Sequence, residues 1–414
     1  MGGWKFNKMG LLKEIKNNKH IYRAYKGVQS FVYRKILSKR VKRVELNYGL
    51  TLDQISDHKN SFFGYYNISP MNKDRILFCV PRGENYSEEI EIYYHGIDGV
   101  HQKVTSSKAW NWQQGCMLHW YDEHKIILND YDEINKQYYS RIVDLYEDRC
   151  RYLPIPIYAL SHNRKFALSL NFQRLSVLRP DYGYFKIKSS DLMPLAKDGI
   201  WYMDFETDQY ELLISLKDIQ ILCGLNQKKG AYKNIRVNHL DISPDDKRFM
   251  FLFRWVEGDR TYSGLIVYER AQKRLKLVHS GMISHCCWLN DNEIISFCRF
   301  SPFGNRYVKF SLDDGEREII KNLPKVDGHP SIDDTGEWLV TDTYPDRSRM
   351  SSLYLYNFAD REKYLLGRFF QPAKYVKQNR IDLHPKWASG QRKIFFESGH
   401  DGSRKLYCLD ISRV

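Results

Sequence analysis

Four histidines stand at regular intervals in the second half of the chain. His239, His285, His329 and His384 are separated by 46, 44 and 55 residues, and each opens a short apolar segment. A neutral imidazole can bind a transition metal or act as a general base near neutral pH. If a repeated fold brings the four rings together, the chain can hold a metal ion or move a proton at that place.

A carboxylate accompanies the last of these histidines. In the segment 378–384, the alternation of an extended chain puts Asp382 and His384 on one side. Imidazole and carboxylate together suit Mn, Zn, Fe or Ni, whereas Ca and Mg prefer oxygen ligands alone. We therefore expect a divalent-metal site made of His329, Asp382 and His384, with Asn379 as a fourth ligand. The alternative is that Asp382 only holds the His384 ring and both brace the fold.

The histidines belong to a pattern that recurs along the chain as an apolar strand, a turn, a second apolar strand and a third strand. The repeats open at seven places: Asn67, Cys116, Tyr158, His239, His285, His329 and His384. The spacing of the last four openings is that of one four-stranded propeller blade with its loops. The last repeat stops after its third strand, and residues 44–52 can supply the missing strand, which closes the ring. The sequence thus predicts an all-β, seven-bladed β-propeller over residues 44–414.

The propeller geometry predicts which side chains share one mouth of the central channel. The first strand of a blade lies innermost and the second strand returns antiparallel to it. The start of the first strand and the end of the second strand therefore lie at the same mouth of the channel. The third repeat also carries an insertion, residues 173–199, which is long enough to be a lid or substrate clamp or an ordinary surface excursion. We assign substrate binding to residues of this mouth and insertion: Arg82, Arg299, Arg174, Arg179, Tyr182, Asp342 and Tyr344.

The positive charge of the chain is concentrated in residues 1–43, which hold thirteen Lys and Arg against the single acid Glu14. Residues 8–43 predict a basic amphipathic helix, which can bind an anionic membrane surface or an acidic partner, or else pack on its own domain. The rest of the chain is nearly neutral and the basic segment lacks a groove-reading motif, so we expect no nucleic-acid partner.

Composition narrows the setting further. Aromatic residues make up 14% of the chain and the mean hydropathy is −0.57, which is typical of a soluble, sheet-rich protein. The eight cysteines show no CxxC or zinc-ligand spacing, and buried free thiols in a reducing compartment are the better interpretation. The first residues lack the apolar segment of a secretion signal. We therefore expect a cytoplasmic protein, with contact to the inner face of the membrane through the basic helix.

Three stretches resemble a known family. The register of His285, of Asp327-Gly-His329-Pro and of Asp382-Leu-His384-Pro, followed by 397–402 (Glu-Ser-Gly-His-Asp-Gly), is similar to the oligogalacturonate lyase type of seven-bladed propeller, within the wider TolB/WD40-like group. The resemblance covers roughly residues 235–402. It implies β-elimination on uronate-containing glycans with a manganese-type ion, so that Mn is favoured over Zn or Ca. It implies His329 and His384 as metal ligands.

The chain departs from that pattern at two ligand positions. Asp382 stands where the family has a histidine, and Asn379 or Gln378 stands where it has a glutamine. The resemblance also implies His285 and an arginine, Arg254 or less favourably Arg260, at the catalytic positions, and we add His239 from its place in the register.

The residue types suit this chemistry. Removal of the C5 proton of a uronate requires a base and a positive charge that neutralises the carboxylate. We therefore expect a polysaccharide or oligosaccharide lyase that acts on an anionic glycan. The alternative is a propeller without catalytic activity that binds glycans or serves as a scaffold in surface-polysaccharide assembly. A glycoside hydrolase is disfavoured because no convincing pair of carboxylates is evident.

Overall fold

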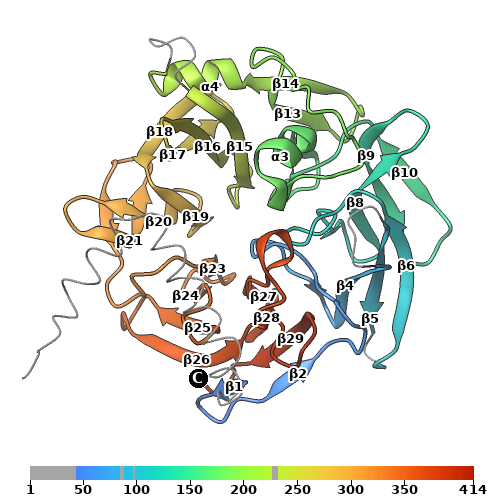
Figure 1. The fold of residues 1–414 in the computed structure, drawn as a ribbon, viewed down its shortest axis with the longest axis vertical. Coiled ribbons are helices and arrows are strands. Elements are labelled where there is room, and N and C mark those ends of the chain that lie inside the picture. Colours follow the sequence, from blue (N-terminus) through green and yellow to red (C-terminus); the bar gives the residue numbers. More distant parts are fainter. Residues whose placement is uncertain (1–42, 84–87, 97, 226–231) are drawn as a thin grey trace, which may run out of the picture.

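A computed structural model describes residues 43–83, 88–96, 98–225 and 232–414, and the basic helix predicted over residues 8–43 lies outside this part apart from Arg43. The described residues form seven antiparallel sheets arranged as blades around a central axis (Figure 1). The prediction of an all-β, seven-bladed β-propeller is therefore confirmed. No helix in the described ranges is long and apolar enough to cross a membrane.

Each blade contains four strands in chain order from the axis outward, apart from the closing strands. The first three blades comprise β3 (Met71–Asn72), β4 (Arg75–Pro81), β5 (Ile90–His95) and β6 (His101–Ser107); β7 (His119–Trp120), β8 (Lys125–Asp132), β9 (Gln137–Asp144) and β10 (Cys150–Leu153); and β11 (Ala159–Leu160), β12 (Phe166–Leu170), β13 (Gly199–Asp204) and β14 (Tyr210–Ser215). The fourth and fifth comprise β15 (Tyr232–Ile242), β16 (Arg248–Glu257), β17 (Arg260–Glu269) and β18 (Arg274–Gly281); and β19 (Ile283–Trp288), β20 (Glu293–Phe300), β21 (Gly304–Ser311) and β22 (Arg317–Ile319).

The sixth and seventh blades include the N-terminal strands. The sixth comprises β23 (Ser331–Ile332), β24 (Trp338–Asp342), β25 (Met350–Asn357), β26 (Lys363–Phe370) and β1 (Val44–Leu46); the seventh comprises β27 (Lys386–Trp387), β28 (Lys393–Ser398), β29 (Lys405–Asp410) and β2 (Leu52–Gln54). The helical elements are α3 (Phe172–Leu178), α4 (Leu216–Leu222) and two short 3₁₀ turns, η2 (Pro180–Tyr182) and η3 (Lys377–Asn379).

The second strand of each blade is largely apolar and buried in its middle because neighbouring blades cover both of its faces. In β16 the five residues 249–253 are completely buried, whereas most of the outer strand β18 is exposed or half-buried. Adjacent blades are also joined by buried indoles, whose N–H groups donate to a backbone carbonyl of the blade before: Trp120 to Pro70, Trp288 to Asp241 and Trp387 to Ser331.

The closing strand differs from the prediction. Residues 44–52 form not one strand but two. β1 pairs with β26 of the sixth blade, and β2 pairs with β29 as the outer strand of the seventh. The reason is a turn between them, in which Tyr48 and Gly49 both have positive φ (56° and 64°). The outer strand of the last blade therefore comes from Leu52–Gln54, and only Leu52 lies within the predicted range.

A buried ionic network completes the ring on the inside. Glu397 of β28 is completely buried and binds Arg404 (3.0 Å) and Lys386 (3.5 Å). Its other contacts are the backbone N–H groups of Phe63 and Gly64, which precede the first blade. The last blade is thus held to the first by charge-assisted hydrogen bonds as well as by strand pairing.

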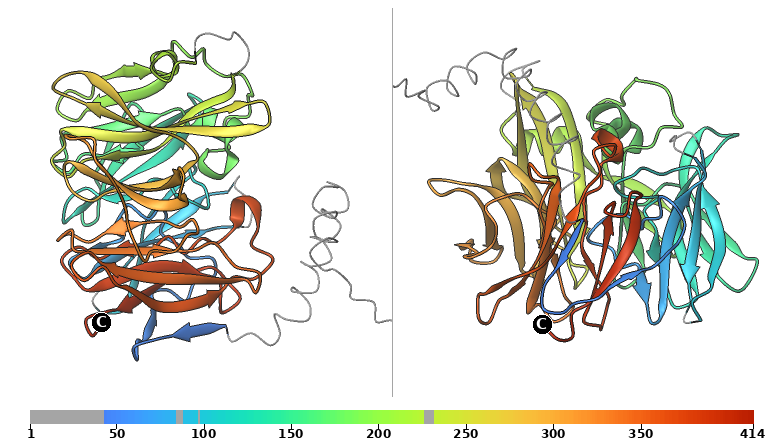
Figure 2. Two further views of the ribbon diagram at one scale, coloured as in Figure 1. Left: turned by 90° about the vertical axis from the view of Figure 1, so that its left-hand side faces the viewer. Right: turned by 60° about the horizontal axis from the view of Figure 1, so that its bottom comes forward.

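The insertion in the third blade stands over one mouth of the ring. It begins with α3, which Asn171 caps by accepting a hydrogen bond from the N–H of Arg174, and continues through η2 to the start of β13. In both views of Figure 2 the insertion and η3 stand at the same end of the ring, and η2 and η3 are in contact. This is the mouth at which the sequence places the histidines.

Candidate functional site

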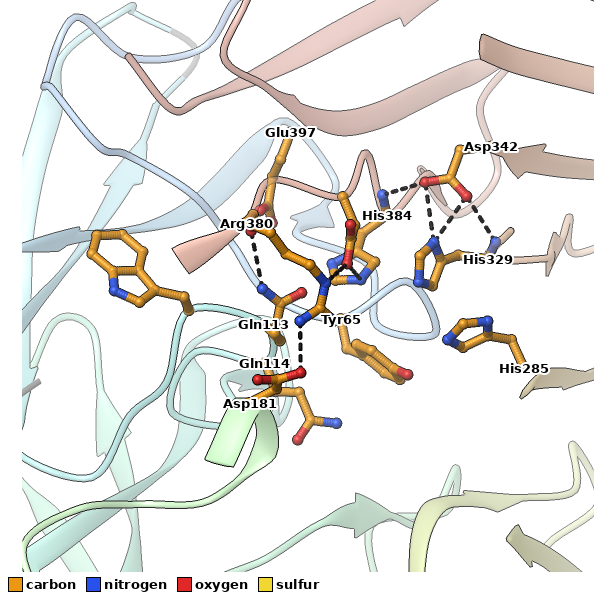
Figure 3. A network of polar contacts seen from close by, with 12 residues as sticks. Tyr65, Gln113, Gln114, Asp181, His285, His329, Asp342, Arg380, His384 and Glu397 are labelled. Carbon is orange, nitrogen blue, oxygen red and sulfur yellow. Dashed lines mark hydrogen bonds and ion pairs between the residues drawn. The ribbon is translucent and has the colours of Figure 1, made fainter. Parts of the chain in front are cut away.

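The four repeat-opening histidines converge on the axis of the propeller (Figure 3 shows three of them). Ring centroids are 5.3 Å apart for His239 and His285, 4.2 Å for His285 and His329, and 4.3 Å for His329 and His384. The four residues are between 1% and 5% exposed. Four blades therefore contribute one imidazole each to a single buried cluster.

Two of these histidines have an unusual backbone. His239 and His384 have φ of 54° and 45°, in the left-handed region. In β15 the pairing with β16 shifts register between Asn238 and Asp241, around His239. Only a few per cent of residues other than glycine adopt this conformation, with histidine among the more tolerant types, and backbone of this kind occurs in turns and at functional sites.

Asp342 holds two of the histidines, His329 by its ring and backbone and His384 by its backbone. Its carboxylate accepts hydrogen bonds from Nδ1 of His329 (2.9 Å) and from the backbone N–H groups of His329 (2.8 Å) and His384 (3.2 Å). Burial lowers the pKa of His329, but the neighbouring carboxylates, Asp342 foremost, outweigh it and raise the pKa. Asp342 is completely buried, so it acts as a support for the cluster rather than as the substrate contact that the sequence predicts.

The ligand atoms of three residues lie together without partners. Within the described residues, Nε2 of His329, both ring nitrogens of His384 and Oδ1 of Asp382 are buried and form no hydrogen bond. One ligand atom from each residue lies within 4.8 Å of the others. Unpartnered polar atoms are rare in protein interiors, and this donor set suits a divalent transition metal. The residues therefore fit a metal ion, and Asp342 would orient His329 behind it.

Asn379, the fourth ligand predicted from the sequence, has a different contact. Its side-chain oxygen accepts a hydrogen bond from the backbone N–H of Val376 (3.0 Å) and so caps η3. The reason is local, because η3 turns the chain just before the extended segment that carries Asp382 and His384. The structure thus places the amide oxygen in a turn and not beside the three ligand atoms.

Arg380 connects the cluster to the insertion. Its Nε donates to Asp382 (2.7 Å) and one Nη donates to Asp181 of η2 (2.7 Å). Figure 3 shows the contact between Arg380 and Asp181 as a dashed line. One guanidinium thus joins a candidate metal ligand to the segment that stands over the mouth. Sequence analysis missed both residues, since nothing in their spacing indicates the pairing.

His285 has the geometry of a general base. Its Nδ1 lies 3.1 Å from Asp327, which also accepts a hydrogen bond from Ser284. Within the described residues no hydrogen bond engages Nε2. Burial, with the charge of His329, lowers the pKa of His285 against the opposing effect of Asp327. The ring is therefore neutral near pH 7, with one nitrogen held by a carboxylate and the other free.

His239 is paired with a tyrosine that sequence analysis missed. The hydroxyl of Tyr65 lies 2.7 Å from Nδ1 of His239, and burial raises the pKa of Tyr65 and lowers that of His239 well below its usual value. A signal was present in the sequence. Tyr65 lies five residues before Pro70, as His239 lies five before Pro244, so the two occupy the same position in their repeats.

Three of the arginines predicted to bind substrate are paired elsewhere. Arg82 is exposed and binds Glu89 and Glu91 of its own blade. Arg299 is exposed, and its Nε lies 3.4 Å from the Asn305 side chain of the neighbouring strand. Arg174 is buried, but Asp198 at the other end of the insertion neutralises it (2.6 Å). The structure brings none of these guanidinium groups to the histidines, because each has a closer partner.

Four other predicted residues border the cluster. The ring of Tyr182 lies 5.7 Å from that of His239, and the ring of Tyr344 lies 5.6 Å from that of His329. Arg179 lies over the Tyr182 ring (5.5 Å). Arg254 donates from one Nη to the carbonyl of Ser284, next to His285.

Tyr66 separates the cluster from a cavity further along the channel. Its ring lies 5.4 Å from that of His329, and its hydroxyl donates to the carbonyl of Cys286. The cavity, of about 810 Å³, is lined by Tyr66 and by residues at the far ends of the first strands, among them Asp241, Trp288 and Trp387. Tyr66 thus stands between the histidine cluster and this cavity.

Comparisons with known proteins identify the fold. No protein-family model and no curated protein sequence matches the chain. An oligogalacturonate lyase from Vibrio parahaemolyticus has a similar structure, with a TM-score of 0.62 over 89% of this chain and 96% of that chain, at 13% identity. An oligogalacturonate lyase in complex with manganese gives 0.58 over 88% and 94%, also at 13% identity. TolB from Acinetobacter baumannii gives 0.39 over 82% and 80%, at 9% identity. The predicted resemblance is thus confirmed at the level of the fold, and the chain is a seven-bladed β-propeller built like these lyases.

Proposed function

We propose that the chain is a lyase that cleaves uronate-containing polysaccharides or oligosaccharides by β-elimination with the help of a divalent metal. The observation that carries this proposal is the set of unpartnered ligand atoms on His329, Asp382 and His384, which lies beside the His285–Asp327 pair. The fold shared with oligogalacturonate lyases supports the choice of substrate, and the manganese named for one of them supports the choice of metal.

The side chains of the cluster divide the reaction between them. A metal held by His329, His384 and Asp382 would neutralise the uronate carboxylate and so make the C5 proton more acidic. His285 takes this proton at Nε2, while Asp327 holds its other nitrogen. The C5–H electron pair becomes the C4–C5 double bond, and the bond from C4 to the glycosidic oxygen breaks. The Tyr65–His239 pair holds a proton that the leaving oxygen can take.

Arg254 contributes charge rather than basicity. Its Nε and both Nη groups donate hydrogen bonds to oxygen atoms, as a protonated guanidinium does, and an arginine in this form carries charge but cannot accept a proton. Its positive charge lies close enough to lower the pKa values of His239 and His285. This favours His285 over Arg254 as the base.

A second candidate function has one observation in its favour. The four imidazoles are at most 5% exposed, so substrate reaches them only when side chains or the insertion move. A propeller that binds acidic glycans at this mouth, or acts as a scaffold in surface-polysaccharide assembly, needs no such movement. The cytoplasmic setting, and a membrane or protein contact through residues 1–43, belong to both proposals and rest on the sequence alone.

The test is formation of the unsaturated product. Purified protein loaded with Mn²⁺ is incubated with polygalacturonate and other uronate glycans, and the ultraviolet absorbance of the 4,5-unsaturated uronate is followed. Metal-stripped protein is the control. We expect absorbance to rise only with the loaded protein. Binding of the glycan without any rise in absorbance would reject the lyase and support the binding module.

A further inference from the structure

Two arginines lie opposite each other on neighbouring strands of the fourth blade. Arg236 of β15 and Arg254 of β16 are direct register partners. Arg236 is 6% exposed and Arg254 is partly buried. Like charges at directly opposed positions destabilise a sheet, and buried charges are normally paired. The pair therefore requires a source of negative charge.

The protein does not supply that charge within the described residues. Neither arginine forms an ion pair there, and Arg254 donates only to neutral oxygens, those of Asn238, Ser263, Ile283 and Ser284. Arg236 donates from one Nη to the carbonyl of Asn234, and its buried Nε has no acceptor. Burial lowers the pKa of Arg236 to about 10, and the charges of Arg254 and Arg179 add to this effect. A pKa of about 10 still leaves Arg236 charged near pH 7.

The third arginine comes from the insertion. Arg179 lies over the ring of Tyr182 (5.5 Å), and that ring lies 5.7 Å from the ring of His239, which follows Arg236 in β15. The charge of Arg179 also lowers the pKa of Arg236 and of Arg254. Its own carboxylate partner, Asp181, is 3.4 Å away and is shared with Arg380 at 2.7 Å. Positive charge is thus in excess on this side of the mouth.

The arginines and the candidate metal ligands lie on two different sides of the histidine cluster. Arg254 bonds to the carbonyl of Ser284, directly before His285, so the arginines border the candidate base on the side of blades four and five. The candidate metal ligands come from the segments that open blades six and seven. A ligand that spans the cluster can therefore present one anionic group to each side.

We propose that Arg236, Arg254 and Arg179 form a second carboxylate-binding subsite, which holds the acidic sugar next to the one that reacts. The choice of a uronate as the ligand rests on the proposed function. The substrate is then an oligomer with at least two consecutive free uronates, one carboxylate at the metal ligands and the next at the arginines. A neighbouring sugar whose carboxylate is esterified cannot neutralise the pair, so it binds more weakly.

The substitution Arg236→Gln tests the subsite with two measurements. In low-salt buffer without multivalent anions, we expect the melting temperature of R236Q to equal or exceed that of the parent protein, because the like-charge pair is gone. In calorimetry with Mn²⁺ and trigalacturonate that has no 4,5 double bond, we expect the affinity of R236Q for the trisaccharide to fall roughly 10- to 100-fold, the effect of one charge-assisted hydrogen bond. Methyl-esterified trigalacturonate should bind the parent protein more weakly, and R236Q should remove most of that difference.

A control variant and three possible outcomes distinguish the carboxylate-binding subsite from the lyase reaction. Arg149→Gln removes the same charge from a side chain that is 82% exposed and should change neither measurement. An R236Q protein that is less stable and binds trigalacturonate normally would overturn the subsite, even if product forms. Weaker binding by R236Q in a protein that forms no product would keep the subsite and reject the reaction. Absence of any binding to the parent protein would reject both.

Discussion

The carboxylate of Asp342 holds His329 twice, through the Nδ1 of the ring (2.9 Å) and through the backbone N–H (2.8 Å). The opposite ring nitrogen, Nε2, is consequently directed away from Asp342, and it has no partner among the described residues. A carboxylate behind a ligating histidine fixes its tautomer and raises its basicity. The same carboxylate reaches the backbone of His384, so one residue orients two of the candidate ligands.

Asp342→Asn therefore tests the metal site without removing a ligand. The amide can still accept one hydrogen bond but carries no charge, and we expect the affinity for Mn²⁺ to fall roughly 10- to 100-fold. Titration calorimetry on metal-stripped protein measures this. Asp327→Asn, which changes the carboxylate behind His285 instead, is the matched control and should bind Mn²⁺ nearly as well as the parent. Equal losses in both variants would contradict the assignment.

His285→Ala separates catalysis from binding. If Nε2 of this residue removes the C5 proton, we expect the turnover rate to fall by roughly 10²- to 10⁴-fold, the usual contribution of a general base. The affinity for trigalacturonate should change little, because the carboxylates bind at the metal ligands and the arginines. His124→Ala, at an exposed position, is the control. Unchanged turnover in H285A would remove His285 from the mechanism.

Metal removal should lower stability as well as activity. A ligand that binds only the folded state at about 100 times its dissociation constant stabilises the protein by about 2.7 kcal/mol. We expect Mn²⁺ to raise the melting temperature of chelator-treated protein, with Ca²⁺ less effective because two of the three candidate ligands are imidazoles. The increase should be absent in His384→Ala, in which one of the three candidate ligands is missing. A shift that persists in this variant would place the ion elsewhere.

Much of the fold could be predicted from the sequence because a propeller repeats one local pattern. An opening residue, an apolar strand, a turn and a second apolar strand recur at similar spacing in every repeat except the third, which carries the insertion, and ring closure follows from the number of repeats. The split of the closing strand could not be predicted, because it depends on whether Tyr48 and Gly49 adopt positive φ. That choice is made by the two blades to which β1 and β2 pair.

The site could be predicted where the position of a residue in the repeat determines where its side chain lies. It could not be predicted where a long side chain can form ion pairs with several neighbours. The four histidines meet because strand starts lie near the axis whatever the side chain. Arg82 and Arg174 are taken by Glu91 and Asp198, contacts that depend on the packing of strands and of the insertion. Arg236 was not predicted as a site residue, because it is distinguished by the lack of a carboxylate partner among the described residues. The sequence does not show which arginines lack such a partner.

Asp241 predicts a pH dependence of stability. Burial raises the pKa of this carboxyl group to about 7, although the side chain of Asn67 donates a hydrogen bond to it (3.2 Å). In the unfolded chain the pKa is about 3.9. Between these values the folded protein binds more protons than the unfolded chain, so this group makes the free energy of unfolding decrease as pH rises from about 4 to 7. In urea unfolding, Asp241→Asn should be more stable than the parent at pH 8 and should lose that advantage near pH 4. An advantage independent of pH would contradict the titration of Asp241.

The Asp181–Arg380 contact predicts that the insertion controls access to the cluster. Arg380 is held by Asp382 on one side and by Asp181 on the other, each at 2.7 Å. Asp181→Asn leaves Arg380 bound to Asp382 but removes the charge that holds η2 over the mouth. We therefore expect faster hydrogen exchange throughout residues 173–199 and faster association of trigalacturonate, with the affinity for Mn²⁺ retained because no ligand changes. Asp191→Asn, in an exposed part of the same insertion, should leave both rates unchanged. Exchange that is unaltered in D181N would mean that the buried Arg174–Asp198 pair alone holds the insertion in place.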